Sequence, residues 1–161
     1  MDLELRDKRV LVTGASRGIG LACVEGFLEE GATVTLVSRP SSRLGEETSR
    51  LAARYPEAVA SIPADLSTAD GIAMLAPSLT EADVVVNNAG AERFGDESRW
   101  PEALAHLPFG RAALPVEIAN LAVFVASSRA SYLSGVVIDA DAGAMYTDAS
   151  GEGGIRTPER G

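Results

Sequence analysis

Short runs of β-branched residues alternate along the first half of the chain with segments whose apolar residues recur at helical spacing. Residues 10–13 and 32–37 are runs of the first kind, which are typical of strands buried on both faces. Residues 21–30 between them carry apolar side chains at helical spacing, and Gly31 follows, a typical residue just past a helix end. The pattern predicts a strand, a helix and a second strand.

The same alternation continues to residue 86. Residues 41–54 are predicted to form a helix and residues 58–62 a third strand. The sequence S-x-x-D at 67–70 is a weak capping box, which predicts a helix that stops by Pro77, and residues 83–86 predict a fourth strand. Strands that alternate with helices over short connections indicate an α/β fold with a doubly wound, Rossmann-like parallel sheet and helices on both faces.

Residues 115–138 add a last helix and a last strand. Pro115 suits the first position of a helix over 115–127. The expected core face of this helix comprises Ile118, Leu121, Ala122 and Val125. Val123 and Phe124 make the other side apolar too, as in a helix that is sandwiched in a core or lies in a subunit contact. With a strand over 134–138, we expect about five strands in the order 3-2-1-4-5.

The 161-residue length suits one domain, which we expect to span residues 1–146. Residues 147–161 are rich in glycine, proline and charge and contain one large apolar residue, Ile155. We therefore expect a disordered tail there.

Three glycines follow the first strand in the sequence VLVTGASRGIG. Gly14 lets the chain turn sharply off the strand, Gly18 lets a diphosphate approach the backbone, and Gly20 lets the helix pack against the sheet. An anion at this helix start would meet unpaired N–H groups and the positive end of the helix dipole. The alternative is a tight turn that binds nothing. The sequence NNAG at 87–90 follows the fourth strand at the same edge of the expected sheet, which favours a ligand site.

These two sequences, T-G-x-x-x-G-x-G at 13–20 and N-N-A-G at 87–90, resemble the fingerprints of the short-chain dehydrogenase/reductase family. The resemblance covers residues 5–95 and 108–143 and implies a bound nicotinamide dinucleotide. Asp65 falls where that family places the Asp that contacts adenine. The cofactor-binding residues that the resemblance implies are Gly14, Ser16, Arg17, Gly18, Ile19, Gly20, Ser38, Arg39, Asp65, Leu66, Asn88, Ala89 and Gly90.

The end of the second strand bears on the choice between NADP(H) and NAD(H). An acidic residue at this position favours a free ribose 2′-hydroxyl, whereas an arginine accommodates a 2′-phosphate. The chain has Ser38 and Arg39 there, and Arg17 in the glycine loop adds a second positive charge. We therefore expect NADP(H) to be preferred, with NAD(H) as the lesser alternative. A second interpretation is that both arginines are solvated loop residues that bind nothing.

The family's chemistry rests on a Tyr-x-x-x-Lys pair, and this chain lacks one. Its only lysine is Lys8, and the residues four positions after its three tyrosines, Tyr55, Tyr132 and Tyr146, are Val59, Val136 and Ser150. The resemblance implies that two strand–helix units are missing between Gly90 and Leu114, so the fold is truncated relative to the family. We expect no catalytic residues and little or no oxidoreductase activity on carbonyl or alcohol substrates.

Two alternatives stay open beside this shortened oxidoreductase. One is a non-enzymatic nucleotide-binding or dimerisation module, and the other is an internally deleted product. The resemblance also implies a homodimer through helix 115–127 and strand 134–138, a contact that the apolar side chains of Val123 and Phe124 independently favour.

Charge and composition exclude several kinds of partner and site. A net charge of −9 repels phosphate backbones, so we expect no nucleic-acid partner. No run of about eighteen apolar residues occurs, and we expect no membrane contact and a cytoplasmic location. The single cysteine, Cys23, is expected to be a small core residue. The lone His106 has no partner at metal-binding spacing, so we expect no metal site.

Overall fold

Four parallel strands form the sheet of the computed structural model, which describes residues 1–90, 104–105 and 107–143. Neighbouring strands follow the order β3-β2-β1-β4, as predicted for the first four. The strands are β1 (Arg9–Thr13), β2 (Thr33–Ser38), β3 (Val59–Pro63) and β4 (Val84–Val86). The helices are α1 (Gly18–Glu29), α2 (Ser42–Arg54), α3 (Ala69–Glu81), α5 (Pro115–Val125) and the short 3₁₀ helix η2 (Ser128–Ala130).

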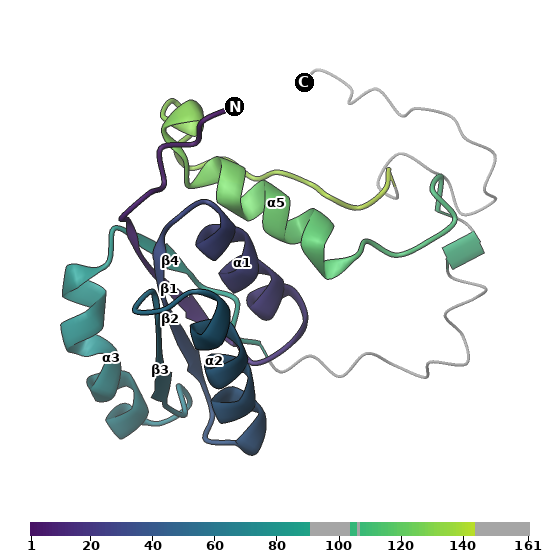
Figure 1. The fold of residues 1–161 in the computed structure, drawn as a ribbon. Helices are drawn as coiled ribbons and strands as arrows, with labels where there is room; N and C mark the ends of the chain where they lie inside the picture. The colour runs from purple at the N-terminus through teal and green to yellow at the C-terminus, as the bar shows by residue number, and fades with distance from the viewer. Residues whose placement is uncertain (91–103, 106, 144–161) are drawn as a thin grey trace. The chain divides into compact units, whose positions relative to one another are not determined.

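Helices cover both faces of the sheet, which confirms the predicted doubly wound α/β fold. Figure 1 shows α1 and α2 on one face, with α5 lying along α1, and α3 on the other face. The chain divides into two compact units, the first made of Met1–Gly90 and Pro115–Ser134 and the second of Ala91–Leu114 and Gly135–Gly161. All of these strands and helices belong to the first unit. The single domain over 1–146 stays a prediction, and the tail 147–161 lies outside the described residues.

The first βαβ unit ends its helix as the sequence predicts. Gly31 adopts a left-handed conformation with φ +83°, which glycine tolerates without strain. The N–H groups of Gly31 and Ala32 then donate to the carbonyls of Leu28 and Phe27 at 3.1 and 3.0 Å, the two bonds of a Schellman cap. The chain therefore leaves α1 and enters β2 within three residues.

Two apolar clusters lie on opposite faces of the sheet. The larger joins β1 and β2 to α1, α2 and α5, with Phe27 and Val24 fully buried at its centre and Cys23 buried beside them, as predicted. The smaller contains Leu11, Val37, Ala64 and Leu75, under α3. Val85 pairs in register with Leu11 on this second face and remains 47% exposed, so α3 leaves the β4 side of the face uncovered.

The start and end of α3 differ from the sequence prediction. The helix is capped by Thr68 rather than Ser67, since the Thr68 hydroxyl accepts from the N–H of Gly71 at 3.0 Å. The predicted stop at Pro77 is wrong, because α3 continues to Glu81. Pro77 lies on the exposed side of the helix, so the backbone donor that proline lacks is lost away from the apolar cluster.

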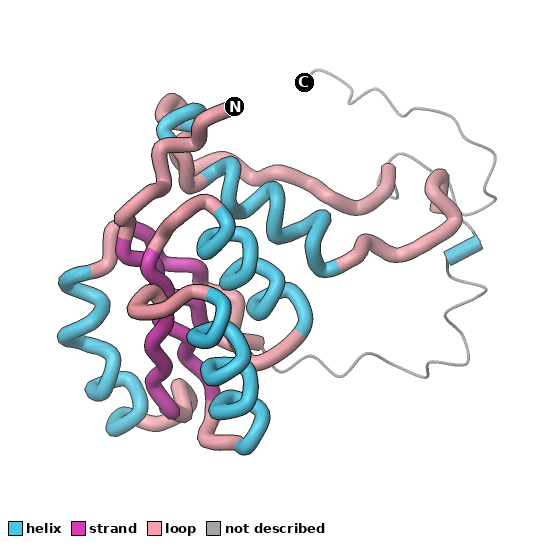
Figure 2. Tube along the Cα trace, in the orientation of Figure 1, coloured by secondary structure: helices cyan, strands magenta, loops and turns pink. Residues whose placement is uncertain are grey.

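The predicted fifth strand over 134–138 is wrong, and the described residues contain four strands. Figure 2 shows the chain after η2 as loop. Gly135 has φ +65°, which interrupts an extended backbone at the start of the segment. The three β-branched residues that suggested the strand are exposed, Val137 by 87%. A β-branched run becomes a strand only where it finds a hydrogen-bonding edge, and β4 is only three residues long.

The face that α5 buries also differs from the prediction. Ala119 and Val123 are its buried residues, whereas Val125 from the predicted core face is 37% exposed. A Cβ on Gly26 of α1 would lie 3.0 Å from a methyl group of Val123, so this glycine allows the two helices to approach closely. Because α5 is apolar on nearly all sides, its periodicity alone could not identify this face.

Candidate functional site

The carboxyl ends of the strands are held together by hydrogen bonds between the segments that follow them. The N–H of Ala15, in the loop after β1, donates to the carbonyl of Val37 in β2 at 3.1 Å. The N–H of Ala64, just after β3, donates to the carbonyl of Ser38 at 2.9 Å. Arg17, Arg39 and Asp65 follow these bonded residues by one or two positions, so all three lie at one edge of the sheet.

The hydroxyl of Thr13 joins the end of β1 to the segment after β4. Its oxygen accepts from the N–H groups of Asn88 and Ala89 at 3.0 and 2.9 Å. Its proton has two acceptors, the Val86 carbonyl at 3.4 Å and the Asn87 side-chain oxygen at 3.3 Å. The Asn88 amide group in turn donates to the carbonyl of Thr13 at 3.1 Å. Neither Thr13 nor Asn87 is among the predicted site residues, although both stand inside the two motifs.

Two of the three loop glycines are needed for close packing. A Cβ on Gly14, which has φ +65°, would lie 2.9 Å from the Asn88 amide nitrogen. A Cβ on Gly20 would collide with the carbonyl oxygen of Gly14 and lie 2.6 Å from the same nitrogen. Gly20 therefore packs against the glycine loop and Asn88, a more specific role than the predicted packing on the sheet.

Gly18 differs from the other two glycines. It has φ +57°, and nothing lies within 4 Å of the position where its Cβ would stand. The first hydrogen bond of α1 runs from the N–H of Leu21 to the carbonyl of Arg17 at 3.3 Å. The N–H groups of Gly18, Ile19 and Gly20 come before this bond and have no acceptor within the helix. This open space beside a helix N-terminus fits the approach of a diphosphate.

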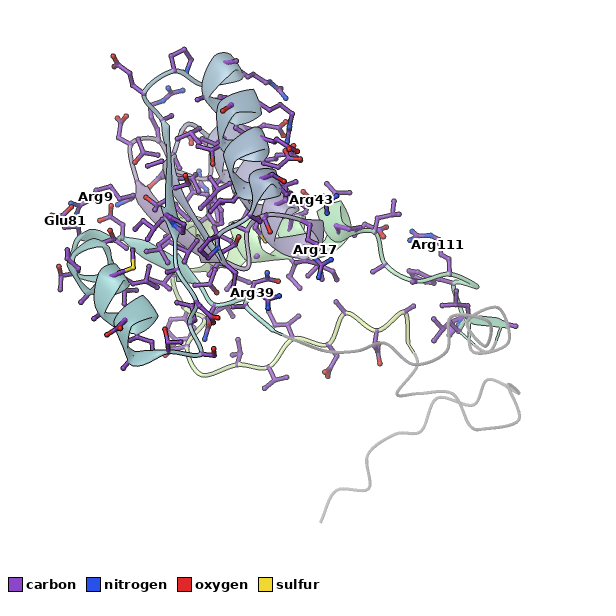
Figure 3. All side chains as sticks on the ribbon, turned by 90° about the horizontal axis from the view of Figure 1, so that it is seen from below. Arg9, Arg17, Arg39, Arg43, Glu81 and Arg111 are labelled. Atoms are coloured by element: carbon purple, nitrogen blue, oxygen red, sulfur yellow. The ribbon has the colours of Figure 1, made fainter. Side chains whose placement is uncertain are left out.

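Positive charge gathers at this edge of the sheet. Arg17 is the N-cap residue of α1, and Arg39 directly follows β2. Neither forms an ion pair within 4 Å with any described residue. Figure 3 shows both in one region, apart from Arg9 and Glu81.

Asp65 brings one negative charge to the same edge. Its Oδ1 accepts from the backbone N–H of Ser67 at 3.0 Å and from the Ser67 hydroxyl at 2.7 Å. These hydrogen bonds stabilise the carboxylate and lower the pKa of Asp65, and the charge of Arg39 lowers it further. Asp65 is therefore ionised at neutral pH and held in a fixed turn.

The predicted cofactor-binding residues thus fall into four segments, one after each strand. Gly14, Ser16, Arg17, Gly18, Ile19 and Gly20 follow β1, Ser38 and Arg39 close β2, Asp65 and Leu66 follow β3, and Asn88, Ala89 and Gly90 follow β4. The carboxyl edge of a parallel sheet is where such folds bind ligands. Their contacts with a nucleotide stay a prediction.

Residues 8–106, more than half of the chain, match the family model described as short chain dehydrogenase. The chain belongs to the short chain dehydrogenase family. It is similar to the rhamnolipids biosynthesis 3-oxoacyl-(acyl-carrier-protein) reductase of Pseudomonas aeruginosa, with 40% identity over 109 residues that cover 65% of this chain and 39% of the relative. It is also similar to the gluconate 5-dehydrogenase of Gluconobacter oxydans, with 36% identity over 93 residues, 56% of this chain and 36% of that one. The chain therefore spans under two fifths of the length of these relatives in the matched region.

Solved structures share the fold. The RhlG/NADP active-site complex of Pseudomonas aeruginosa matches with a TM-score of 0.74 and 23% identity, covering 88% of this chain and 98% of that one. The L-sorbose reductase of Gluconobacter frateurii, solved with NADPH and L-sorbose, matches with a TM-score of 0.71 and 21% identity, covering 84% and 95%.

The short chain dehydrogenase catalytic pair has no counterpart here. Lys8 precedes the amino end of β1, whereas the candidate site follows its carboxyl end, about 16 Å away along a five-residue strand. Tyr132 is fully exposed after η2. Glu92 and His106, the two other candidates for a proton donor, lie outside the described residues.

Neither a metal centre nor a membrane span is found in the described part of the chain. No three His, Cys, Asp or Glu side chains come together there as metal ligands would. No described helix has the length and apolar character needed to cross a bilayer.

We expect Thr13→Val to lower the free energy of unfolding by about 2 kcal/mol, because the N–H groups of Asn88 and Ala89 lose their acceptor while the side chain keeps its shape. Urea unfolding followed by circular dichroism measures the change. Thr35→Val on β2 is the control, since the Thr35 hydroxyl makes no hydrogen bond to a described residue, and we expect its effect to stay within about 0.5 kcal/mol. Equal losses in the two variants would contradict the role of the Thr13 hydroxyl.

Proposed function

We propose that this short chain dehydrogenase is a shortened, NADP(H)-binding member of an oxidoreductase family, with little or no turnover of carbonyl or alcohol substrates. The observation that carries the proposal is the placement of Arg17 and Arg39 in the segments that follow β1 and β2, which a hydrogen bond from Ala15 to Val37 joins, with no acidic residue at the end of β2. The open space at Gly18 and the free N–H groups of α1 support a diphosphate beside them.

The cofactor also agrees with the related structures. The RhlG structure is an NADP complex and the L-sorbose reductase structure contains NADPH, both with this fold. A bound NADPH would supply a hydride. In this chain, Arg17 and Arg39 would hold its 2′-phosphate, the turn at Asp65 would face its adenine, and the glycine loop would hold its diphosphate.

We expect NADP(H) to bind without turnover because the chain contains the groups for binding and lacks the family's Tyr-x-x-x-Lys pair as a proton donor. Hydride transfer to a carbonyl needs a proton donor fixed within hydrogen-bond reach, and the amides of Asn87 and Asn88 have no proton of suitable pKa. A non-enzymatic nucleotide-binding module and an internally deleted product are the two alternatives.

We expect NADPH to bind more tightly than NADH, and Arg39→Ala to weaken NADPH binding about tenfold while leaving NADH unchanged, because only NADPH carries the 2′-phosphate. Isothermal titration calorimetry measures both affinities. Arg6→Ala, which removes the same charge before β1 at the other end of the sheet, should change neither. Equal affinity for the two cofactors in the wild-type chain would refute the NADP(H) preference.

We expect NADPH oxidation with ketone, aldehyde or keto-sugar substrates to be indistinguishable from buffer. The measurement is the absorbance of NADPH over hours with highly purified chain. A steady turnover that falls when His106 or Glu92 is replaced would show that another proton donor has been recruited, and it would overturn this part of the proposal.

We propose in addition a homodimer formed through α5. Val116 and Phe124, about two turns apart on one side of this helix, are 51% and 38% exposed, an apolar surface that a second copy would cover. Val123 is buried against α1 and does not contribute to the surface, contrary to the prediction from sequence.

We expect the chain to be dimeric at roughly 50 μM in light scattering, a concentration at which micromolar contacts are occupied. Phe124→Asp should give monomers because it introduces a charge into the contact. Phe109→Asp, at a residue 71% exposed outside α5, should leave the dimer intact. A monomeric wild-type chain would count against the contact, as would a dimer that persists in Phe124→Asp.

A further inference from the structure

Arg43 is a third arginine at the edge where Arg17 and Arg39 lie. It is the second residue of α2 and stands four positions after Arg39, across the short connection from β2. Figure 3 shows the three labelled side chains in one region of the molecule. The sequence motifs do not identify Arg43, because it belongs to the helix after the strand rather than to either fingerprint.

The first turn of α2 is held in a defined place. The Ser41 hydroxyl caps the helix by accepting from the N–H of Leu44 at 3.3 Å. Leu44 itself is 3% exposed and packs in the larger apolar cluster. Arg43 is therefore an exposed side chain on a backbone that the Ser41 cap and the buried Leu44 hold in place.

The other arginines of α2 are neutralised, and Arg43 is not. Arg50 pairs with Glu25 and Glu47 at 2.5 and 2.7 Å, and Arg54 pairs with Glu29 at 3.6 Å. Arg17, Arg39 and Arg43 form no ion pair within 4 Å with any described residue, in a chain that carries 23 acidic residues against 14 basic ones. Acidic residues thus outnumber basic ones in the chain, yet within the described residues none forms an ion pair with these three arginines, and Asp65 acts on Arg39 only through its charge at longer range.

The position of Arg43 is also unfavourable for the helix itself. A helix N-terminus carries a partial positive charge and favours acidic residues in its first turn. Neither α1 nor α2 has an acidic residue in its first turn, and each begins with or beside an arginine. Three cations and two helix N-termini at one edge of the sheet repel one another, and the single carboxylate of Asp65 offsets only part of this positive charge.

We propose that Arg43 is a specificity-determining residue that binds the 2′-phosphate of NADP(H) together with Arg17 and Arg39. A phosphate monoester carries nearly two negative charges at neutral pH and three acceptor oxygens, which three guanidinium groups satisfy from different sides. The inference rests on the proposed function, because it assigns a further residue to the same nucleotide site.

The test compares two probes that differ only in the 2′-phosphate, adenosine 2′,5′-bisphosphate and 5′-AMP, by isothermal titration calorimetry. Arg43→Ala should weaken binding of the bisphosphate roughly fivefold, the effect of a charge-assisted contact at an exposed site, and leave 5′-AMP unchanged. It should also flatten the salt dependence of bisphosphate binding, since one fewer cation faces the phosphate. Arg43→Lys should restore part of the affinity.

Arg54→Ala is the matched control, because it removes the same charge from the other end of the same helix. It should not change the ratio of the two affinities. If Arg43 had a structural role, Arg43→Ala would lower the melting temperature. The proposal instead expects the melting temperature of Arg43→Ala to be unchanged or higher, because the substitution removes a positive charge from a helix N-terminus.

The outcomes separate this inference from the proposed function. If Arg39→Ala loses the preference for the bisphosphate and Arg43→Ala keeps it, the role of Arg43 is refuted and NADP(H) binding stands. If the wild-type chain binds both probes equally, the NADP(H) preference and the role of Arg43 are refuted, and if it binds neither, the nucleotide site is refuted with them.

Discussion

The candidate site depends on one hydroxyl group, that of Thr13, which joins two strand ends far apart in the sequence. By accepting from the N–H groups of Asn88 and Ala89, it fixes the segment after β4 against the end of β1. The Asn88 amide is then close enough to the glycine loop to leave no room for a Cβ on Gly14 or Gly20. The glycines are therefore required by the protein's own packing at two positions, and only Gly18 leaves space for a ligand.

The sequence predicts the alternation of strands and helices up to residue 86 because each element there carries a local signal. β-branched runs mark the strands. Gly31 marks the end of α1 because a residue without a Cβ adopts the left-handed conformation, and Ser41 marks the start of α2 because its hydroxyl caps the helix. The glycine loop, the arginines and Asp65 are identifiable for the same reason, since each stands at a known distance from a predicted strand end. The partners of Thr13 are not visible locally, because they lie about 75 positions away.

The sequence prediction fails for features that depend on residues distant in the sequence. The run of residues 136–138 has the composition of a strand, but pairing decides whether a strand forms, and Gly135 already turns the backbone away from an extended path. α5 is apolar on nearly every side, so Gly26 on another helix decides which face is buried. Pro77 is tolerated inside α3 because the helix exposes that side, a fact that depends on how α3 lies on the sheet.

The hydrogen bonds that hold the candidate site together all lie within the part of the family's fold that the chain contains. The four segments after the strands are connected by backbone and side-chain hydrogen bonds among residues 13–15, 37–38, 64 and 88–89, all within the first ninety residues. None of these bonds passes through the region where the family places its Tyr-x-x-x-Lys pair. One face of the sheet is incompletely covered at β4. Val85 there is half exposed, because no helix among the described residues packs over it. The residues proposed for nucleotide recognition and the Tyr-x-x-x-Lys pair that the family uses for proton transfer thus belong to different segments of the sequence, so a chain can contain the first and lack the second.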